Sequence, residues 1–106
     1  MKVVLYAKAF GKDYDCLMRD MLHLLQESGV EIIVYESFLS DIKHCFNDDI
    51  NYSVLKKTDD IKGKADVLFS FGGDGTILDS VPIIRDSGIP VCGINTGNLG
   101  FLSSVS

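Results

Sequence analysis

Apolar residues along the chain fall into short continuous runs separated by stretches with a helical period. Residues 3–7 form an apolar run of the kind found in strands that are covered on both faces. Comparable runs occupy residues 30–35, 67–71 and 89–94. Each run predicts a buried β-strand.

Between the first two runs, apolar residues recur at intervals of three and four, as on one face of an α-helix. This stripe consists of Tyr14, Leu17, Met18, Met21, Leu22 and Leu25. Asp13 is the expected N-cap, because its side chain can accept a hydrogen bond from the first turn. Gly29 is expected just beyond the C-terminal cap, where positive φ is needed.

Weaker helical patterns cover residues 37–46 and 77–85. Pro82 lies inside the second pattern, and proline lacks an N–H and clashes with the preceding helical turn. We therefore expect this helix either to begin near residue 79 or 80 or to kink there.

Residues 47–64 are polar and predict a mobile connection, with one short element at residues 52–55. On either side of it, strands alternate with helices. This alternation implies parallel strands joined by right-handed crossovers, and so a single α/β domain over residues 1–106. We expect an open parallel sheet in which residues 3–7, 67–71 and 89–94 are inner strands.

Two glycine-rich segments follow two of the predicted strands. Phe71-Gly72-Gly73-Asp74-Gly75-Thr76 leaves one strand, and Asn95-Thr96-Gly97-Asn98-Leu99-Gly100-Phe101-Leu102 leaves the next. Ligands of open α/β sheets bind beyond the carboxyl ends of the strands. Both segments are therefore expected on one rim of the sheet.

The first segment has the composition of a phosphate-binding loop. Its three glycines let a polyphosphate approach the backbone, and the helix that follows favours an anion at its N-terminus. Asp74 lies among these glycines. A carboxylate that faces phosphates is electrostatically unfavourable unless it has a function, such as accepting a proton or binding Mg²⁺. The alternative interpretation is a tight strand-to-helix turn with an aspartate cap.

The second segment combines hydrogen-bonding side chains with close backbone approach. Asn95 and Thr96 supply the former, and Gly97 and Gly100 allow the latter. Phe101 is placed to stack on a base or ring. The alternative is that Leu99, Phe101 and Leu102 only pack beneath the sheet rim. We prefer this alternative for Leu99 and Leu102, but not for Phe101.

Composition narrows the possible partners. The 106 residues include 15 acidic and 10 basic side chains, a net charge of -5, which speaks against nucleic acid or an anionic membrane as partner. No run approaches the roughly 20 apolar residues of a membrane span, and the N-terminus does not resemble a signal peptide. The expected location is the cytoplasm.

The cysteines and histidines give no metal-binding pattern. Cys16, Cys45 and Cys92 are far apart in apolar surroundings and are expected to be reduced, packed thiols. His44 precedes Cys45, but no further ligand follows at usable spacing. His23 is expected where the first helix meets solvent.

The order strand, GGDGT, helix, strand, NTGNLGFL resembles the NAD kinase family over essentially the whole chain. Diacylglycerol kinase-like and sphingosine kinase-like lipid kinases and phosphofructokinases carry loops similar to GGDGT, but do not follow it with NTGNLGFL at this distance. The resemblance implies a Rossmann-like open parallel sheet with flanking helices, the N-terminal domain of such an enzyme.

The resemblance also implies roles for individual residues. Asp74 would be the catalytic carboxylate that activates the 2′-hydroxyl of the adenosine ribose of NAD. The NAD-binding residues would be Asp74, Gly75 and Phe101; Gly72, Gly73 and Thr76 would lie near the donor phosphates; Asn95 and Gly97 would support the second loop. Asp79 stands where many members carry a basic or polar residue that reaches the ligand, so it is left out of the site.

The family transfers a phosphoryl group from ATP, and in some members from polyphosphate, to NAD, giving NADP. Its divalent metal, Mg²⁺, would be held by the phosphates and near Asp74, without a stable metal site in this chain. Family members form homo-oligomers and continue into a β-rich domain that completes both substrate sites. We therefore expect this chain to be a fragment that is inactive alone. The alternatives are a lipid kinase of the diacylglycerol or sphingosine type and a non-catalytic nucleotide-binding module.

Overall fold

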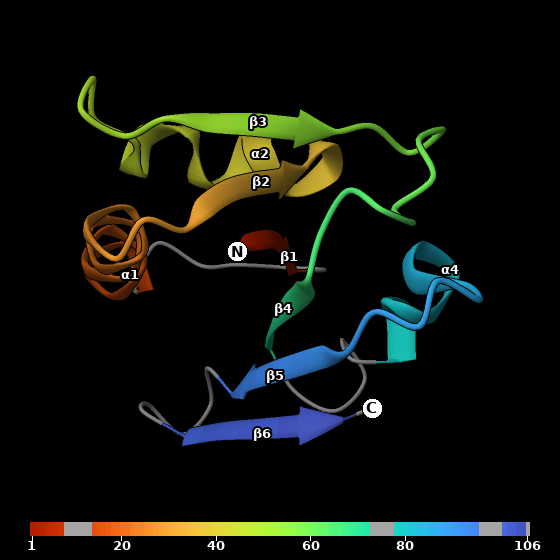
Figure 1. Ribbon diagram of the computed structural model, residues 1–106. Coiled ribbons are helices and arrows are strands. Elements are labelled where there is room, and N and C mark those ends of the chain that lie inside the picture. The colour runs from red at the N-terminus through yellow and green to blue at the C-terminus, as the bar shows by residue number, and fades with distance from the viewer. Residues whose placement is uncertain (8–13, 73–77, 96–100, 106) are drawn as a thin grey trace.

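The computed structural model describes residues 1–7, 14–72, 78–95 and 101–105, with the backbone alone for Asn95 and residues 101–105. Among these residues the strands form one sheet of order β3-β2-β1-β4-β5-β6 (Figure 1). The strands are β1 (Lys2–Ala7), β2 (Glu31–Tyr35), β3 (Tyr52–Leu55), β4 (Val67–Gly72), β5 (Val91–Asn95) and β6 (Phe101–Val105).

The strands from β1 to β5 all pair in parallel, with β1, β4 and β5 in inner positions, as the apolar runs predict. The predicted open parallel sheet is confirmed over these five strands, and β6, which was not expected, adds one antiparallel strand at the edge beside β5. Residues 96–100 are the whole connection between these strands. A parallel return needs a dozen or more residues, so a connection this short requires strand reversal.

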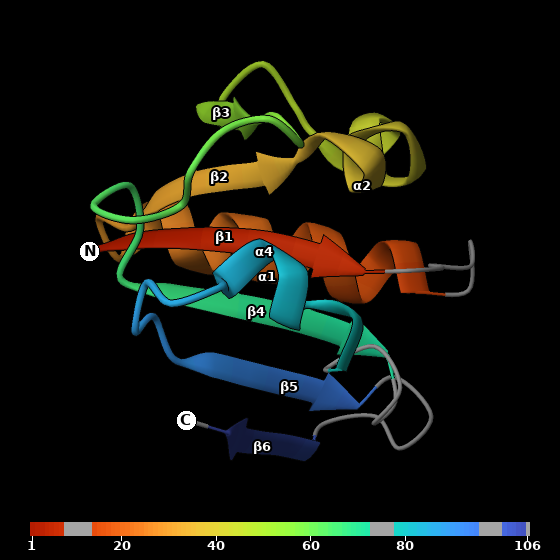
Figure 2. The ribbon, with the colours of Figure 1, turned by 90° about the vertical axis from the view of Figure 1, so that its right-hand side faces the viewer.

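The strand β1 is buried on both of its faces. Val3, Leu5 and Ala7 face one core, and Val4 and Tyr6 face the other. The first core is covered by α1 (Asp15–Glu27), α2 (Glu36–Ile42) and the 3₁₀ turn η2 (Lys43–Cys45), and the second includes residues of α4 (Val81–Ile84). Figure 2 shows α1 and α4 on opposite sides of the sheet. The continuous apolar run therefore reflects two-sided burial.

The helix α1 buries the predicted apolar stripe, with Met18 and Leu22 fully buried against the sheet. It ends in a Schellman motif around Gly29, whose φ is 78°. The N–H of Gly29 donates to the carbonyl of Gln26 at 3.1 Å, and the N–H of Val30 donates to that of Leu25 at 3.0 Å. Gly29 thus has the predicted role, whereas Asp13 lies outside the described residues.

The two weaker helical patterns both give short helices. The pattern over residues 37–46 corresponds to α2 and η2. In the pattern over residues 77–85, α4 follows Ser80 and carries Pro82 in its first turn, where the missing N–H would have no helical partner. The helix ends after one turn, at Arg85, whose φ is 52°. Residue 77 lies outside the described residues.

The polar segment of residues 47–64 contains the predicted short element as β3, which pairs with β2. It is also anchored by three buried apolar side chains, those of Ile50, Leu55 and Ile61. Ile61 packs on the same sheet face as α4. The expectation of a mobile connection is therefore wrong where these three side chains enter the core.

Candidate functional site

Three of the residues singled out by sequence form a row across the sheet. Gly72, the last residue of β4, pairs with Asn95, the last residue of β5. Asn95 in turn pairs with Phe101, the first residue of β6. The two glycine-rich segments thus leave the sheet from adjacent positions on one rim (Figure 2), as predicted.

This rim also contains the point where the strand order reverses direction. From β1 the chain proceeds to β2 on one side, and later to β4 on the other. In doubly wound sheets, ligands bind in the crevice at the carboxyl ends of the strands at such a point. The sheet therefore presents its expected ligand position beside the end of β4. Among the predicted site residues, Gly73, Asp74, Gly75, Thr76 and Gly97 lie outside the described residues.

The backbone at Gly72 requires glycine. Its φ is 139°, in a region that side chains with a Cβ atom rarely adopt. The residue is still paired in the sheet at this point. The first glycine of GGDGT is thus explained by the conformation in which the chain leaves β4.

The row rests on a packed layer of side chains. Phe71 is fully buried, and its ring lies 6.0 Å from that of Phe38 on α2, measured between centroids. Ile94, the residue before Asn95, is also buried. On the opposite face, the Ser70 hydroxyl is buried without a hydrogen-bond partner among the described residues. The strand ends that carry the two segments are therefore held firmly by the core.

Electrostatics near the rim involve Tyr6 and Asp79. Burial raises the pKa of the Tyr6 hydroxyl, and the charge of Asp79 and the neighbouring Tyr35 raise it further. The rings of Tyr6 and Tyr35 meet edge to face with centroids 5.5 Å apart. Asp79 is half-buried, and its charge acts on Tyr6 of β1.

Two open cavities lie at the other rim. One of about 350 Å³ is formed where α1 ends and where β2 and β3 begin, and one of about 260 Å³ lies beside Lys2, Val54 and Lys64. Both are near the amino ends of strands, whereas the glycine-rich segments follow carboxyl ends. Neither cavity therefore coincides with the strand ends from which the two segments leave.

Comparison with known proteins identifies the family of this domain. Residues 4–106 match the ATP-NAD kinase N-terminal domain family. The chain belongs to the NAD kinase family.

Relatives in this family align with the whole chain. It is 33% identical to the NAD kinase of Christiangramia forsetii over 105 residues, which are 99% of this chain and 36% of that protein. It is 36% identical to the NAD kinase of Cytophaga hutchinsonii over 106 residues, which cover 98% of this chain and 36% of that protein. The chain thus spans about a third of the length of these NAD kinases.

A solved structure has the same fold. The crystal structure of yeast NADH kinase complexed with NADH matches with a TM-score of 0.70 at 26% identity. The match covers 97% of this chain and 33% of the yeast chain. The α/β sheet with flanking helices is therefore the fold of the NAD kinase N-terminal domain.

The thiols and histidines differ in part from expectation. Cys45 is buried and Cys92 is half-buried, but Cys16 is exposed, so the expectation of three packed thiols is wrong for Cys16. His23 is exposed, at the predicted boundary of α1 with solvent.

No helix among the described segments is long and apolar enough to cross a membrane.

One cluster could not be found from sequence spacing. His44 and Cys45 on η2 lie beside Asp15, in the first turn of α1. Asp15 precedes His44 by 29 residues and Cys45 by 30. Only the packing of α1 and η2 on the same sheet face brings the three side chains together.

Proposed function

We propose that this chain supplies the nucleotide-binding α/β domain of an enzyme that phosphorylates the 2′-hydroxyl of the adenosine ribose of NAD. ATP or polyphosphate would be the donor and NADP the product. The observation that carries the proposal is the pairing of Gly72 with Asn95. It supports one composite site in a member of the NAD kinase family, because the two glycine-rich segments start from neighbouring strand ends.

The proposed division of labour follows the two segments. Asp74 accepts the proton of the attacking hydroxyl, and Gly75 and Phe101 contact the dinucleotide. Gly72, Gly73 and Thr76 lie along the donor phosphates, where missing side chains allow backbone N–H groups to approach. Asn95 and Gly97 shape the second segment. Phe101 is supported by its backbone position, since it pairs with Asn95 at the rim.

A divalent metal, Mg²⁺, is part of the proposal. Phosphoryl transfer develops charge on the phosphate oxygens, and an ion that bridges them neutralises that charge. Mg²⁺ keeps several water ligands and is commonly held by substrate phosphates and one or two carboxylates. Asp74 would be the carboxylate nearest to it.

The decisive experiment is a product assay on the protein that contains this chain. ATP and Mg²⁺ are supplied with NAD, NADH, diacylglycerol or sphingosine in parallel, and phosphorus NMR locates the transferred group. We expect phosphorylation at the 2′-position of NAD or NADH. A phosphorylated lipid would instead support the lipid kinase alternative. Dinucleotide binding without any product would support a non-catalytic module.

We further propose that residues 1–106 form one domain and do not suffice for turnover. The relatives are about three times as long, so other segments are available to complete the site. Isolated residues 1–106 should produce no NADP above the rate without protein. Turnover at typical kinase rates would contradict this.

We place the enzyme in the cytoplasm as a homo-oligomer without nucleic-acid or membrane partners, which cell fractionation and light scattering can test.

A further inference from the structure

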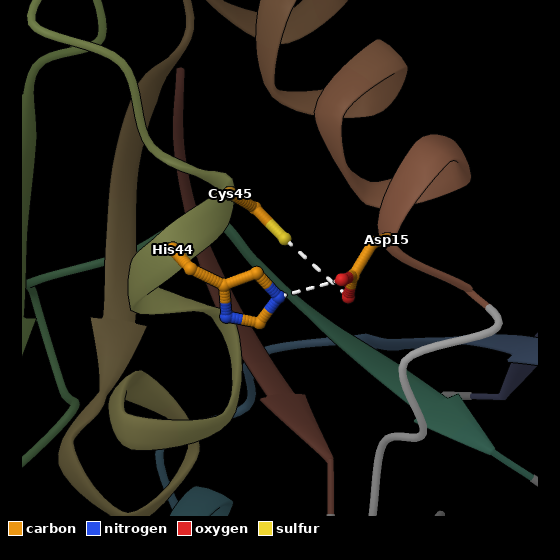
Figure 3. Close-up of side chains that lie close together, drawn as sticks. All are labelled: Asp15, His44 and Cys45. Atoms are coloured by element: carbon orange, nitrogen blue, oxygen red, sulfur yellow. Dashed lines mark hydrogen bonds and ion pairs between the residues drawn. The ribbon is translucent and has the colours of Figure 1, made fainter.

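Asp15, in the first turn of α1, forms a compact cluster with His44 and Cys45 of η2 (Figure 3). Each offers one ligand atom, and these atoms all lie within 4.8 Å of one another. His44 Nε2 is 2.7 Å from Asp15 Oδ2, and Cys45 Sγ is 3.7 Å from Asp15 Oδ1. Imidazole nitrogen, carboxylate oxygen and thiolate sulfur thus converge from two elements.

One of the separations matches that around a tetrahedral metal ion, and a second is shorter. With usual zinc bond lengths, a sulfur and an oxygen ligand are about 3.6 Å apart, and a nitrogen and an oxygen about 3.3 Å. The Cys45–Asp15 separation of 3.7 Å, measured to Oδ1, matches the first value, whereas His44 contacts the other carboxylate oxygen, Oδ2. The His44–Asp15 contact of 2.7 Å is a hydrogen bond and needs to open by about 0.6 Å. The imidazole ring is exposed, so it has room to turn away from Oδ2.

The surroundings suit an ion that enters from one side. Cys45 is only 2% exposed, whereas the side chains of His44 and Asp15 are 46% and 21% exposed. The thiol therefore forms the inner end of the cluster, and the other two ligands reach solvent. Asp15 and a Cys45 thiolate together carry two negative charges, which a divalent cation balances.

The thiol must lose its proton when a metal binds. Burial raises the pKa of the Cys45 thiol, Asp15 raises it further and Arg19 lowers it, so the metal-free thiol donates a hydrogen bond to the Asp15 carboxylate. A bound cation replaces that proton, as in other thiolate sites. One proton leaves the protein for each ion bound through Cys45.

We propose that Asp15, His44 and Cys45 bind a divalent transition-metal ion of the zinc type, with water in the fourth position. Sulfur and imidazole ligands favour Zn²⁺ or Co²⁺ over Mg²⁺, which prefers oxygen. The ion ties the first turn of α1 to η2, two elements joined in the metal-free protein by the contacts of Asp15. None of the three ligands is among the residues proposed for the nucleotide chemistry.

Cobalt titration of the reduced, metal-free full chain tests the proposal. Co²⁺ replaces Zn²⁺ in such sites, and a thiolate ligand gives a charge-transfer band in the near ultraviolet. We expect a band that saturates at one Co²⁺ per chain, disappears when Zn²⁺ is added and persists when Mg²⁺ is added. The same titration should raise the thermal midpoint of unfolding. Absence of the band in the unaltered chain would overturn the proposal.

Variants assign the ligands. His44→Gln changes an exposed side chain, and it should weaken Co²⁺ binding by about 100-fold or more, since even outer partners of a metal site contribute about 10–100-fold. Cys45→Ser should abolish the charge-transfer band. The matched controls are His23→Gln and Cys16→Ser, which alter an exposed histidine and an exposed cysteine outside the cluster. A band lost in Cys16→Ser but kept in Cys45→Ser would refute the assignment, as would unchanged binding in His44→Gln.

Discussion

Gly72 and Asn95 are direct partners across the parallel β4–β5 ladder, and each is the last residue of its strand. This pairing fixes where the two glycine-rich segments begin relative to each other. The geometry of the proposed nucleotide site is thus set by the sheet.

Replacing Gly72 should damage both stability and nucleotide use. At φ 139° a Cβ atom strains the backbone, which costs roughly 1–3 kcal/mol in such regions. Gly72→Ala should therefore lower the free energy of unfolding by this amount in urea titration, and raise the KM for the phosphate donor. Gly29→Ala is the matched control, because Gly29 has φ 78° and open space where a Cβ atom would lie, but ends α1 at the other rim. It should cost stability and leave KM unchanged; equal KM effects in both variants would contradict a local role.

Asp74→Asn separates catalysis from binding. The change keeps the size of the side chain but removes the proton acceptor, and general-base contributions are about 10²–10⁴-fold. In the protein that contains this chain, kcat should fall by that factor, while the KM for NAD changes only a few-fold. Asp20→Asn, on an exposed position of α1, should leave both constants as they are. A kcat within a few-fold of the unaltered protein would favour the tight-turn interpretation of GGDGT.

Ser70→Ala should stabilise the fold. The Ser70 hydroxyl is 1% exposed at residue level and has no hydrogen-bond partner among the described residues. A buried polar group without a partner costs about 1–3 kcal/mol, so its removal should raise the free energy of unfolding by about 1 kcal/mol. Urea titration measures the change. A loss of stability larger than about 1 kcal/mol would mean that the hydroxyl is satisfied in solution.

Alkaline pH should weaken the fold. Burial raises the pKa values of Tyr6, Cys45 and Cys92 above their ordinary values of 10.0 and 9.0. The folded state therefore holds these protons more tightly than the unfolded state. The stabilisation that these protonated groups give to the folded state is complete below their ordinary pKa values. It is lost as the pH rises through their raised pKa values in the folded state.

Urea titrations between about pH 8 and pH 11 measure this loss, which should begin with the thiols and continue with Tyr6. Tyr6→Phe should reduce the slope in the upper part of the range, because the variant has no hydroxyl to ionise there. The free energy of unfolding of the variant at pH 8 is the reference for its values at higher pH. An unfolding free energy that stays constant across the range would contradict the prediction.

The apolar runs were sufficient to predict four of the strands, β1, β2, β4 and β5, because a strand buried on both faces has an unbroken apolar sequence. The strand β3 was predicted only as a short element within a polar segment. The strand over residues 101–105 was missed because it lacks such an unbroken apolar sequence. It follows a glycine-rich segment and contains two serines, so it resembled part of a loop. The short connection before it would have predicted an antiparallel strand, since five residues cannot make a parallel crossover.

The rim could be predicted from sequence, but the cluster of Asp15, His44 and Cys45 could not. A rim position follows from strand order alone, and each segment of the proposed site directly follows its strand. The cluster depends on how α1 and η2 pack side by side on one face of the sheet. Nothing in the local spacing of His44 and Cys45 indicates an aspartate 29 residues earlier.

The central place of β1 has a consequence for synthesis on the ribosome. Its partner β2 emerges soon after it, but the backbone N–H of Lys2 donates to a carboxylate oxygen of Asp66, 64 residues later, where β4 begins. Until β4 has emerged, one edge of β1 has open hydrogen-bonding groups and a continuous apolar sequence. Such an edge is a template for pairing with another nascent chain. Slow translation of residues 47–64 would prolong this exposed stage, and faster translation would shorten it.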